Sequence, residues 1–406
     1  MAYSGGYYDL VSLDQRGIGK TIPFSCYKNE TDALKATLTN RVVTGNSSDT
    51  ALGNLWGYSQ VYVDACQDNP NATNIGSFIG TASTARDLIS IVDALGEDGL
   101  LRFWGLSYGT AVGAAVAAMF PERVDRIILD GVLNIHDYWH HHDIESYEST
   151  DKALTAFLEA CFEAGGRCAL ARPNATAASF EEEFYDWLDD LKYHPIPGPG
   201  FLLDYTAMKS WTLGLLYEPR AFNVLAEIIH GAMTGNLTLV GEGFRLPLTS
   251  AEGRIGIVCG DKTARTSRMD DVLPYVDELH QLSRLGGETA DSFVMQCARW
   301  QMKAKERYTG DYNVETRNPI LAIGNTYDPI TPWVSALNAS QSFPSSVALK
   351  QNGIGHCSVA QASICTVKAI QAYLMNGTMP EPGTVCEIDE PPFSDLSWED
   401  ILTDLS

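Results

Sequence analysis

The pattern of hydrophobic and polar positions changes character twice along the chain. In the first third, short apolar runs of strand length alternate with segments that carry apolar residues at helical spacing. Strands alternating with helices at this pitch predict a parallel sheet with helices on both faces. The expected strands are 8–13, 101–104 and 124–129, and the expected helices are 81–95 and 110–120.

From residue 134 onward helical spacing dominates, and strand-like runs return only at 319–324 and 347–349. We therefore expect a core in two pieces, 1–133 and 311–406, separated by a mainly helical cap or insertion at 134–310. The helices expected in the cap are 147–164, 177–192, 205–217 and 221–233, interrupted by a Pro/Gly loop at 194–200, and a last helix is expected at 358–376.

Charge and composition exclude several classes of partner. The chain has 28 Lys and Arg against 51 Asp and Glu, a net charge of −23. Because phosphate binding needs clustered basic residues, we expect neither nucleic acid nor an anionic membrane as a partner. No apolar run is long enough for a membrane-spanning helix. A peptide or small-molecule substrate remains, and the oligomeric state is left open.

Cysteines and glycosylation sequons together favour an oxidising, secretory compartment, with the protein secreted or lumenal. None of the nine cysteines forms a Cys-x-x-Cys pair, and Cys and His show no zinc-ligand spacing, so no structural metal is expected. The N-terminus lacks the basic and apolar regions of a signal peptide. Seven sequons begin at Asn29, Asn46, Asn71, Asn174, Asn236, Asn338 and Asn376.

One motif carries chemistry. Gly105-Leu106-Ser107-Tyr108-Gly109 lies between a buried strand and a helix of small residues. A serine on such a sharp strand-to-helix turn adopts strained backbone geometry that exposes its hydroxyl, and the helix N-terminus favours negative charge beside it. We expect Ser107 to be a nucleophile and the Tyr108 N–H to be an oxyanion donor. The alternative is an incidental glycine-rich turn.

A serine nucleophile needs a base, and the base needs an orienting carboxylate. In α/β-hydrolases these follow in the order Ser, acid, His, each after a later strand. Asp328 follows the strand at 320–323, and His356 follows the next one. The fold class predicted is therefore the α/β-hydrolase fold, with Ser107, Asp328 and His356 as catalytic residues and no cofactor. A loop-capping Asp and a packed loop His are the alternatives.

Other residues are weaker candidates for a catalytic or metal-binding role. Asp14 and Arg16 follow the expected strand at 8–13, and we interpret them as a structural turn held by an ion pair. Asp261 is a weaker candidate for the acid, because helical segments separate it from the sheet. Four histidines are spaced like metal ligands, but no carboxylate or cysteine completes a site, so a solvated entry to the cap is favoured: His136, His140, His141 and His142.

Together these residues resemble the tripeptidyl/prolyl aminopeptidase family of α/β-hydrolases, in particular its secreted branch with a TAP-like C-terminal region. The similarity covers nearly the whole chain, including the elbow, the Asp-Pro-x-Thr-Pro run that ends at Pro332, and Gly355-His356. It implies an exopeptidase-like hydrolase whose cap narrows access. It also implies a disulfide framework that leaves Cys357 free: Cys26–Cys66, Cys161–Cys168, Cys259–Cys297 and Cys365–Cys386.

The chain departs from the family pattern at its start. Family members carry an HGGPG-like loop and further strands upstream of the strand expected at 8–13, and that loop supplies a second oxyanion donor. Ser4-Gly5-Gly6 is a poor substitute. A truncated N-terminus would explain the missing loop, the missing strands and the missing signal peptide together. The alternative is a natural short form, weakly active or repurposed.

Three functions follow from these residues. The leading hypothesis is hydrolysis of a peptide bond near a free N-terminus through an acyl-enzyme. The second is hydrolysis of an ester, lactone or small amide. The cap determines which substrate can bind, and the sequence alone does not reveal the shape of the cap. The third, from another class, is a catalytically impaired binding module that lacks the upstream oxyanion loop.

Overall fold

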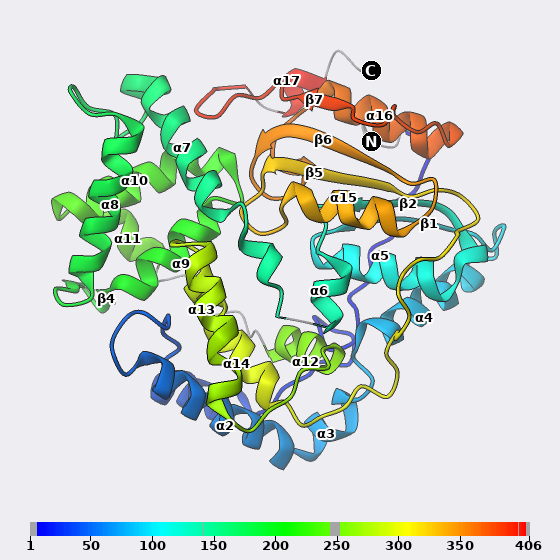
Figure 1. The fold of residues 1–406 in the computed structure, drawn as a ribbon, viewed down its shortest axis with the longest axis horizontal. Coiled ribbons are helices and arrows are strands. Elements are labelled where there is room, and N and C mark those ends of the chain that lie inside the picture. The colour runs from blue at the N-terminus through cyan, green and yellow to red at the C-terminus, as the bar shows by residue number, and fades with distance from the viewer. Residues whose placement is uncertain (1–5, 141, 244–251, 397, 403–406) are drawn as a thin grey trace.

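The computed structural model describes residues 6–140, 142–243, 252–396 and 398–402. Its centre is a sheet of five strands in the order β1-β2-β5-β6-β7, in which every neighbouring pair is parallel (Figure 1). The predicted α/β-hydrolase fold class is confirmed. The strands are β1 (Leu101–Leu106), β2 (Val124–Asp130), β5 (Leu321–Tyr327), β6 (Val347–Ile354) and β7 (Val385–Glu387), and a separate hairpin pairs β3 (Ile196–Gly198) with β4 (Phe201–Leu203).

Helices surround the sheet and form most of the middle of the chain (Figure 1). They are α1 (Glu30–Thr39), α2 (Ala51–Asp68), α3 (Pro70–Gly76), α4 (Thr81–Leu95), α5 (Tyr108–Met119), α6 (Ile135–His140), α7 (Thr150–Ala164), α8 (Ala177–Leu191), α9 (Tyr205–Leu215), α10 (Phe222–Thr234), α11 (Thr238–Gly243), α12 (Glu252–Asp261), α13 (Leu273–Leu282), α14 (Asp291–Arg299), α15 (Trp333–Ser342), α16 (Ile364–Asn376) and α17 (Trp398–Leu402).

Successive residues of β2 face opposite sides of the sheet, and both sides are covered. Ile127 and Leu129 pack with residues of α4, α5 and α15, whereas Ile128 packs with Ile370 and Tyr373 of α16. All of these strand side chains are fully buried. A parallel sheet buried on both faces reads as a continuous apolar run, which is why β2 was recognisable from the sequence.

Helix ends follow local capping chemistry. Helix α4 ends before Gly96, whose left-handed conformation (φ +69°) suits glycine, so the predicted range of 81–95 is confirmed. Helix α16 begins later than predicted, because Ser363 accepts a hydrogen bond from the Thr366 N–H and serves as its N-cap. Residues 358–360 form a short 3₁₀ turn instead.

The strand expected at 8–13 is wrong. This segment forms no β-ladder with β1, and Leu10 and Val11 are 94% and 60% exposed. Alternating apolar residues make a strand only where a ladder partner is available, and here an open cleft of about 1170 Å³ separates the segment from β1 and α4. The Tyr8 hydroxyl instead donates to the Leu374 carbonyl of α16 at 2.7 Å.

Two further features were not predicted. The loop expected at 194–200 contains most of the β3–β4 hairpin. Helices α1 to α3 precede α4, and α2 packs against α14. The helices near the N-terminus therefore contact the region interpreted as the cap, and the division at residues 133 and 310 remains a proposal.

All four disulfides implied by the family resemblance are confirmed, and Cys357 is free and buried. Cys26–Cys66 and Cys259–Cys297 lie in one apolar cluster that contains Phe24 and Trp300. Among the described residues, no helix is both long and apolar enough to cross a membrane. The pairs are Cys26–Cys66, Cys161–Cys168, Cys259–Cys297 and Cys365–Cys386.

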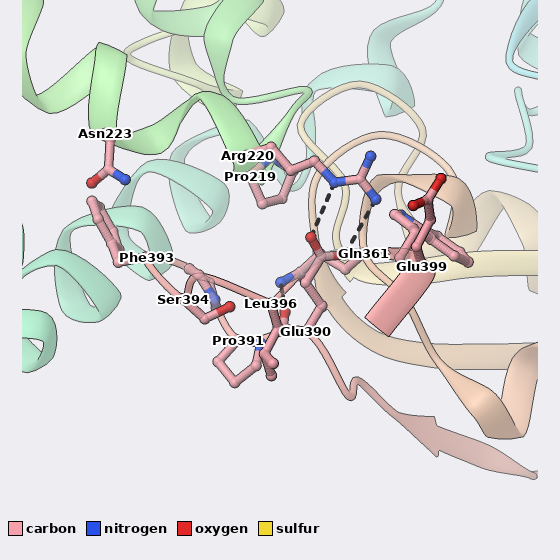
Figure 2. A pocket seen from close by; sticks show the side chains of 12 residues that line it. Pro219, Arg220, Asn223, Gln361, Glu390, Pro391, Phe393, Ser394, Leu396 and Glu399 are labelled. Atoms are coloured by element: carbon pink, nitrogen blue, oxygen red, sulfur yellow. Dashed lines mark hydrogen bonds and ion pairs between the residues drawn. The ribbon is translucent and has the colours of Figure 1, made fainter. Parts of the chain in front are cut away.

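The C-terminal tail contacts the turn that precedes α10. Arg220, in the 3₁₀ turn just before α10, forms an ion pair with Glu390 of the tail, with a distance of 3.0 Å between Nε and Oε1 (Figure 2). The second Glu390 oxygen accepts from the Ala362 N–H at 3.0 Å. Arg220, Glu390 and Phe393 border a cleft of about 430 Å³. The tail thus joins the turn before α10 to the segment that follows β6.

The disulfides should contribute to stability according to the length of chain they close. Cys26–Cys66 spans 40 residues and Cys161–Cys168 spans 7. In the chain-entropy model, removing the first pair by a Cys26→Ala/Cys66→Ala change costs about 4 kcal/mol, and removing the second costs about 2 kcal/mol. Denaturant unfolding of the two variants checks this order; an equal or reversed loss would contradict it.

Candidate active site

Ser107 occupies a strained turn between β1 and α5. Its backbone has φ +55° and ψ −122°, a conformation that L-residues rarely adopt. Gly105 makes the turn possible, because a Cβ at that position would lie 2.3 Å from the Gly109 carbonyl oxygen. At Gly109 a Cβ would meet nothing within 4 Å, so only the first of the two motif glycines is required by packing.

Hydrogen bonds hold the turn on both sides. The Ser107 N–H donates to the Asp130 carbonyl at the end of β2 (3.0 Å), and the Thr110 hydroxyl donates to the Ser107 carbonyl (2.6 Å). Tyr108 is the first residue of α5. The first N–H groups of a helix have no partner within the helix, so the Tyr108 N–H is available beside Ser107.

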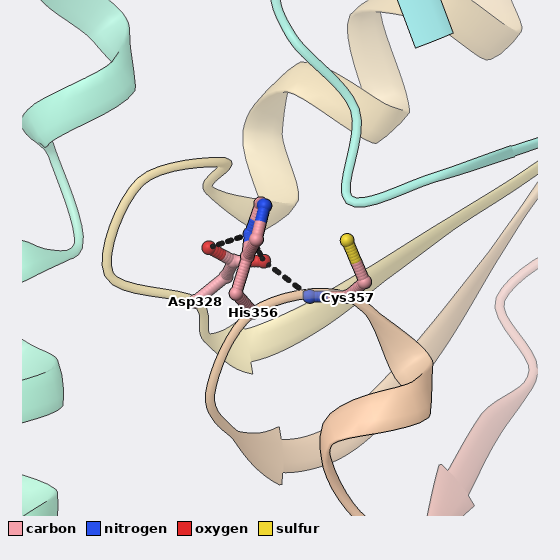
Figure 3. A group of neighbouring side chains, drawn as sticks. All are labelled: Asp328, His356 and Cys357. Carbon is pink, nitrogen blue, oxygen red and sulfur yellow. Dashed lines mark hydrogen bonds and ion pairs between the residues drawn. The ribbon is translucent and has the colours of Figure 1, made fainter. Parts of the chain in front are cut away.

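Asp328 and His356 come together at the ends of neighbouring strands (Figure 3). Asp328 directly follows β5 and is fully buried, and His356 lies two residues after β6. The Nδ1 atom of His356 lies 3.0 Å from Oδ2 of Asp328 and 3.1 Å from Oδ1. This contact leaves Nε2 on the opposite side of the ring, where it can accept a proton.

Asp328 is held by further donors. Its Oδ1 accepts from the N–H groups of Ile330 (2.9 Å) and Thr331 (2.8 Å). Its Oδ2 accepts from the Thr331 hydroxyl (2.7 Å) and the Cys357 N–H (2.9 Å). These bonds fix the carboxylate so that both oxygens face the imidazole ring.

The charges of the pair follow from this geometry. Burial by itself would raise the pKa of Asp328, but the charge and hydrogen bond of His356, with the Cys357 and Thr331 donors, lower it below its ordinary value. Burial by itself would lower the pKa of His356, but Asp328 raises it above its ordinary value. The site therefore favours an ionised carboxylate beside an imidazole of increased basicity.

Asp130 joins the serine turn to the histidine loop. Its carbonyl accepts from Ser107, and its carboxylate accepts from the N–H (2.7 Å) and hydroxyl (2.6 Å) of Ser358. The neighbouring Gly131 has φ +64°, and a Cβ there would lie 2.3 Å from the Cys357 sulfur. Serine turn and histidine loop are thus packed together, although β2 and β5 lie between the strands β1 and β6 that they follow.

The segment between α9 and α10 contacts the histidine loop. The His356 N–H donates to the carbonyl of Tyr217, just beyond α9, at 2.9 Å, and the two rings lie 4.7 Å apart. Gly355 has φ +95°, and a Cβ there would lie 2.6 Å from Pro219. Because His356 contacts Tyr217 directly, changes in the segment between α9 and α10 reach the site.

The remaining candidates lie apart from this site. Asp261 accepts from the Thr81 hydroxyl and the Tyr138 hydroxyl, and burial raises its pKa to about 6 against those bonds. Arg16 pairs with Asp87 of α4 at 2.6 Å, while Asp14 accepts from the Lys20 N–H. The expected structural turn is present, but its ion pair reaches another helix and no strand precedes it.

The histidines at 136–142 are not gathered into a metal-ligand group in the described part of the chain. His136 lies beside Ser342 and Tyr312, and the His142 ring lies 4.1 Å from that of Tyr275. His141 falls outside the described residues, as do Ser4 and Gly5. Among the residues that the structure describes, the one group of metal-ligand types found close together is Asp328, His356 and Cys357, and there the carboxylate and ring nitrogen already bind each other.

Sequence reasoning missed Thr331, Asp130 and Tyr217 as parts of the site. Thr331 could have been recognised, since it lies three residues after Asp328 in the Asp-Pro-x-Thr-Pro run. Asp130 directly follows the expected strand at 124–129, and the local pattern gives no sign of its contact with Ser358. Tyr217 gave no signal, because its contact with His356 joins segments 139 residues apart (356 minus 217).

A parallel sheet with a strained serine after β1 and a hydrogen-bonded Asp–His pair after β5 and β6, at the same edge, defines an α/β-hydrolase. The α/β-hydrolase fold model matches residues 7–188, and the model of TAP-like proteins matches residues 283–386. The chain is thus similar to α/β-hydrolases over its first part and to TAP-like proteins near its C-terminal end.

Curated relatives agree on the class of enzyme. The chain is 26% identical to serine protease Hip1 of Mycobacterium tuberculosis, over 93% of this chain and 74% of the relative. It is 22% identical to the tripeptidyl aminopeptidase of Streptomyces lividans (93% and 70%) and 22% identical to carboxylesterase B of M. tuberculosis (94% and 74%). The protein is a serine hydrolase.

Removing the Thr331 hydroxyl should weaken the site without unfolding it. A hydrogen bond to a charged group contributes about 1.5–3 kcal/mol, so Thr331→Val should slow labelling by a fluorophosphonate probe by roughly ten- to a hundredfold. Thr384→Val is the matched control, because that exposed hydroxyl bonds only the Glu381 carbonyl. Equal labelling rates for the Thr331 and Thr384 variants would show that the hydroxyl has no role.

Proposed function

We propose that Ser107, His356 and Asp328 form a catalytic triad that hydrolyses peptide bonds near a free N-terminus. The observation that carries the proposal is the strained turn of Ser107 together with the Asp328–His356 pair, with the two loops joined through Asp130. A strained serine on an elbow and an oriented imidazole are the two features that make a serine hydroxyl nucleophilic.

The reaction proceeds in two halves. In the first, Nε2 of His356 takes the Ser107 proton while Oγ attacks the carbonyl carbon, and the same proton passes to the leaving amine as the C–N bond breaks. In the second, His356 takes a proton from water, the hydroxide attacks the acyl-enzyme, and Ser107 recovers its proton as the acid product leaves. Asp328 stabilises the imidazolium in both halves and remains ionised.

Negative charge that develops on the carbonyl oxygen needs donors that are already in place. We assign the Tyr108 N–H to this role, because it follows the nucleophile and lies at the start of α5. The positive end of the helix dipole supports the same charge. Both halves of the reaction depend on this donor, since attack on the carbonyl carbon forms an oxyanion in each of them.

The substrate class rests on the relatives and on the cap. Serine protease Hip1 and the tripeptidyl aminopeptidase support a peptide substrate, and the cap segment against His356 supports an enzyme with restricted access. An esterase on a small molecule is the second candidate, favoured by the similarity to carboxylesterase B. A panel of aminoacyl and tripeptidyl anilides beside p-nitrophenyl esters separates the two.

We also propose that the protein works in a secretory or extracellular compartment, because four disulfides form in its structure. Most of the sequon asparagines are exposed and could accept a glycan. Asn338 is the exception, since it is partly buried and its amide donates to Glu145 at 3.2 Å. Glycan attachment is therefore expected at the other positions and not at Asn338.

Ser107→Ala should abolish labelling by a fluorophosphonate probe and lower anilide hydrolysis by roughly 10⁴-fold or more, because the nucleophile is removed. Peptide mass spectrometry locates the adduct. Ser90→Ala is the control, as that exposed hydroxyl donates only to its own helix. An adduct on another serine, or full hydrolysis by Ser107→Ala, would refute the assignment.

The pH dependence follows from the raised pKa of His356. The ring acts as a base only when neutral, so activity should fall as the pH drops through a value above the ordinary histidine pKa of about 6.5. Asp328→Asn removes the carboxylate charge that raises the pKa of His356. The residual activity of this variant should therefore fall at a lower pH than the activity of the wild type. The second-order rate of probe labelling measures both midpoints; a wild-type midpoint at or below 6.5 would contradict the account.

A further inference from the structure

A buried hydrogen-bonded chain leads from α12 to the residue beside the nucleophile. Asp261, the last residue of α12, is fully buried, and its Oδ2 accepts from the Thr81 hydroxyl at 2.5 Å. Thr81, the first residue of α4, has its hydroxyl oxygen 2.7 Å from that of Tyr108. These two hydrogen bonds therefore connect Asp261 to Tyr108 through one side chain, that of Thr81.

Asp261 has a local task that explains part of this contact. Helix α4 begins after Gly80, which has no side chain to cap it, and Asp261 Oδ1 accepts from the Thr81 N–H at 3.0 Å instead. A Cβ on Gly80 would lie 2.8 Å from the same oxygen. Capping of α4 accounts for Oδ1, but it does not account for the hydroxyl chain that starts at Oδ2.

The hydroxyl protons that are present determine which group donates in each of these hydrogen bonds. An ionised carboxylate only accepts hydrogen bonds, so the single proton of Thr81 points to Asp261. The Tyr108 hydroxyl must then donate to the Thr81 oxygen. The Tyr138 hydroxyl donates to the same Asp261 oxygen at 2.8 Å, and its ring lies 6.2 Å from that of Tyr108. The carboxylate thus sets the orientation of every hydroxyl in the chain.

Tyr108 is consequently held at both ends. Its backbone continues the strained turn of Ser107, and its ring packs between the apolar cluster on the sheet and the cluster around the Cys26–Cys66 bridge. A shift of the ring would move the N–H that follows the nucleophile. Donors to an oxyanion act over a narrow range of distance, about 2.7–3.1 Å, so a small shift lowers the rate.

We infer that Asp261 is a positioning residue for the serine turn, acting through Thr81 and the Tyr108 hydroxyl. The inference rests on the proposed function of Ser107 and adds a residue from the mainly helical middle of the chain. Asp261 touches neither substrate nor reacting atoms. Its carboxylate keeps the Tyr108 N–H where the oxyanion forms, in addition to capping α4.

The test is a double-variant cycle read by the rate at which a fluorophosphonate probe labels Ser107. Asp261→Asn keeps the volume but offers an amide donor where the carboxylate accepted, so the Thr81 proton loses its acceptor and the direction of the hydrogen bond between Thr81 and Tyr108 is no longer fixed. Tyr108→Phe keeps the ring and the N–H and removes the hydroxyl. Each change should slow the maximal labelling rate by about five- to thirtyfold, less than the loss of a whole donor, with probe affinity unchanged.

Coupling decides between positioning and capping alone. If Asp261 acts through the Tyr108 hydroxyl, the maximal labelling rate of the double variant should lie within about twofold of that of the slower single variant. If Asp261 only caps α4, the two factors multiply, and that result overturns the inference. Asp151→Asn is the control, because that carboxylate also accepts from a hydroxyl and backbone N–H groups, those of Ser283 to Leu285, and it should lower the melting temperature without slowing labelling.

A second pair keeps the test decisive if Asp261→Asn does not fold. Thr81→Ser retains the hydroxyl and should label at the wild-type rate, whereas Thr81→Val breaks the chain and should match Tyr108→Phe. Wild-type rates for Thr81→Val would overturn the inference. Ser107→Ala is measured in parallel as the unlabelled control. If the wild type is not labelled at Ser107, the proposed function is overturned. If the wild type is labelled at Ser107 but the rate losses of Asp261→Asn and Tyr108→Phe multiply in the double variant, only this inference is overturned.

Discussion

The buried carboxylate of Asp130 is the contact on which the arrangement of the site depends. Strands β1, β2, β5 and β6 are neighbours and parallel, so their carboxyl ends meet at one edge of the sheet. Strand pairing alone does not bring the loops beyond those ends into contact. Asp130 does so, because its backbone carbonyl binds the serine turn and its side chain binds Ser358, two residues after His356.

A carboxylate in this position is costly unless its oxygens are satisfied. Burial raises the pKa of Asp130 to about 6, against the opposing bonds from Ser358 and Trp104 and the charge of His356. Asp328, with more donors and the imidazole beside it, keeps a lowered pKa although it is equally buried. The number and charge of the partners thus separate a structural carboxylate from one suited to orient a base.

Much of this could be predicted from the sequence where the signal is local. The strand before Ser107, the turn itself and helix α4 each follow from neighbouring residues, as do the positions of Asp328 and His356 after strands. The segment 8–13 was misjudged, because a strand requires a partner that the alternating pattern does not reveal. Helix α1 escaped detection since it buries no side chain and so lacks an apolar stripe. Contacts such as Tyr217 with His356 depend on how the middle of the chain folds back onto the sheet.

The central claim is that Ser107, His356 and Asp328 act as one unit, and the labelling rate of Ser107 in combined variants tests it most directly. Residues that act as a unit show strongly non-additive effects. We predict that Asp328→Ala/His356→Ala labels no more slowly than His356→Ala alone, because Asp328 acts only through the imidazole. If the loss from Asp328→Ala multiplies with that from His356→Ala, Asp328 does not act through His356, and the account of the site is contradicted.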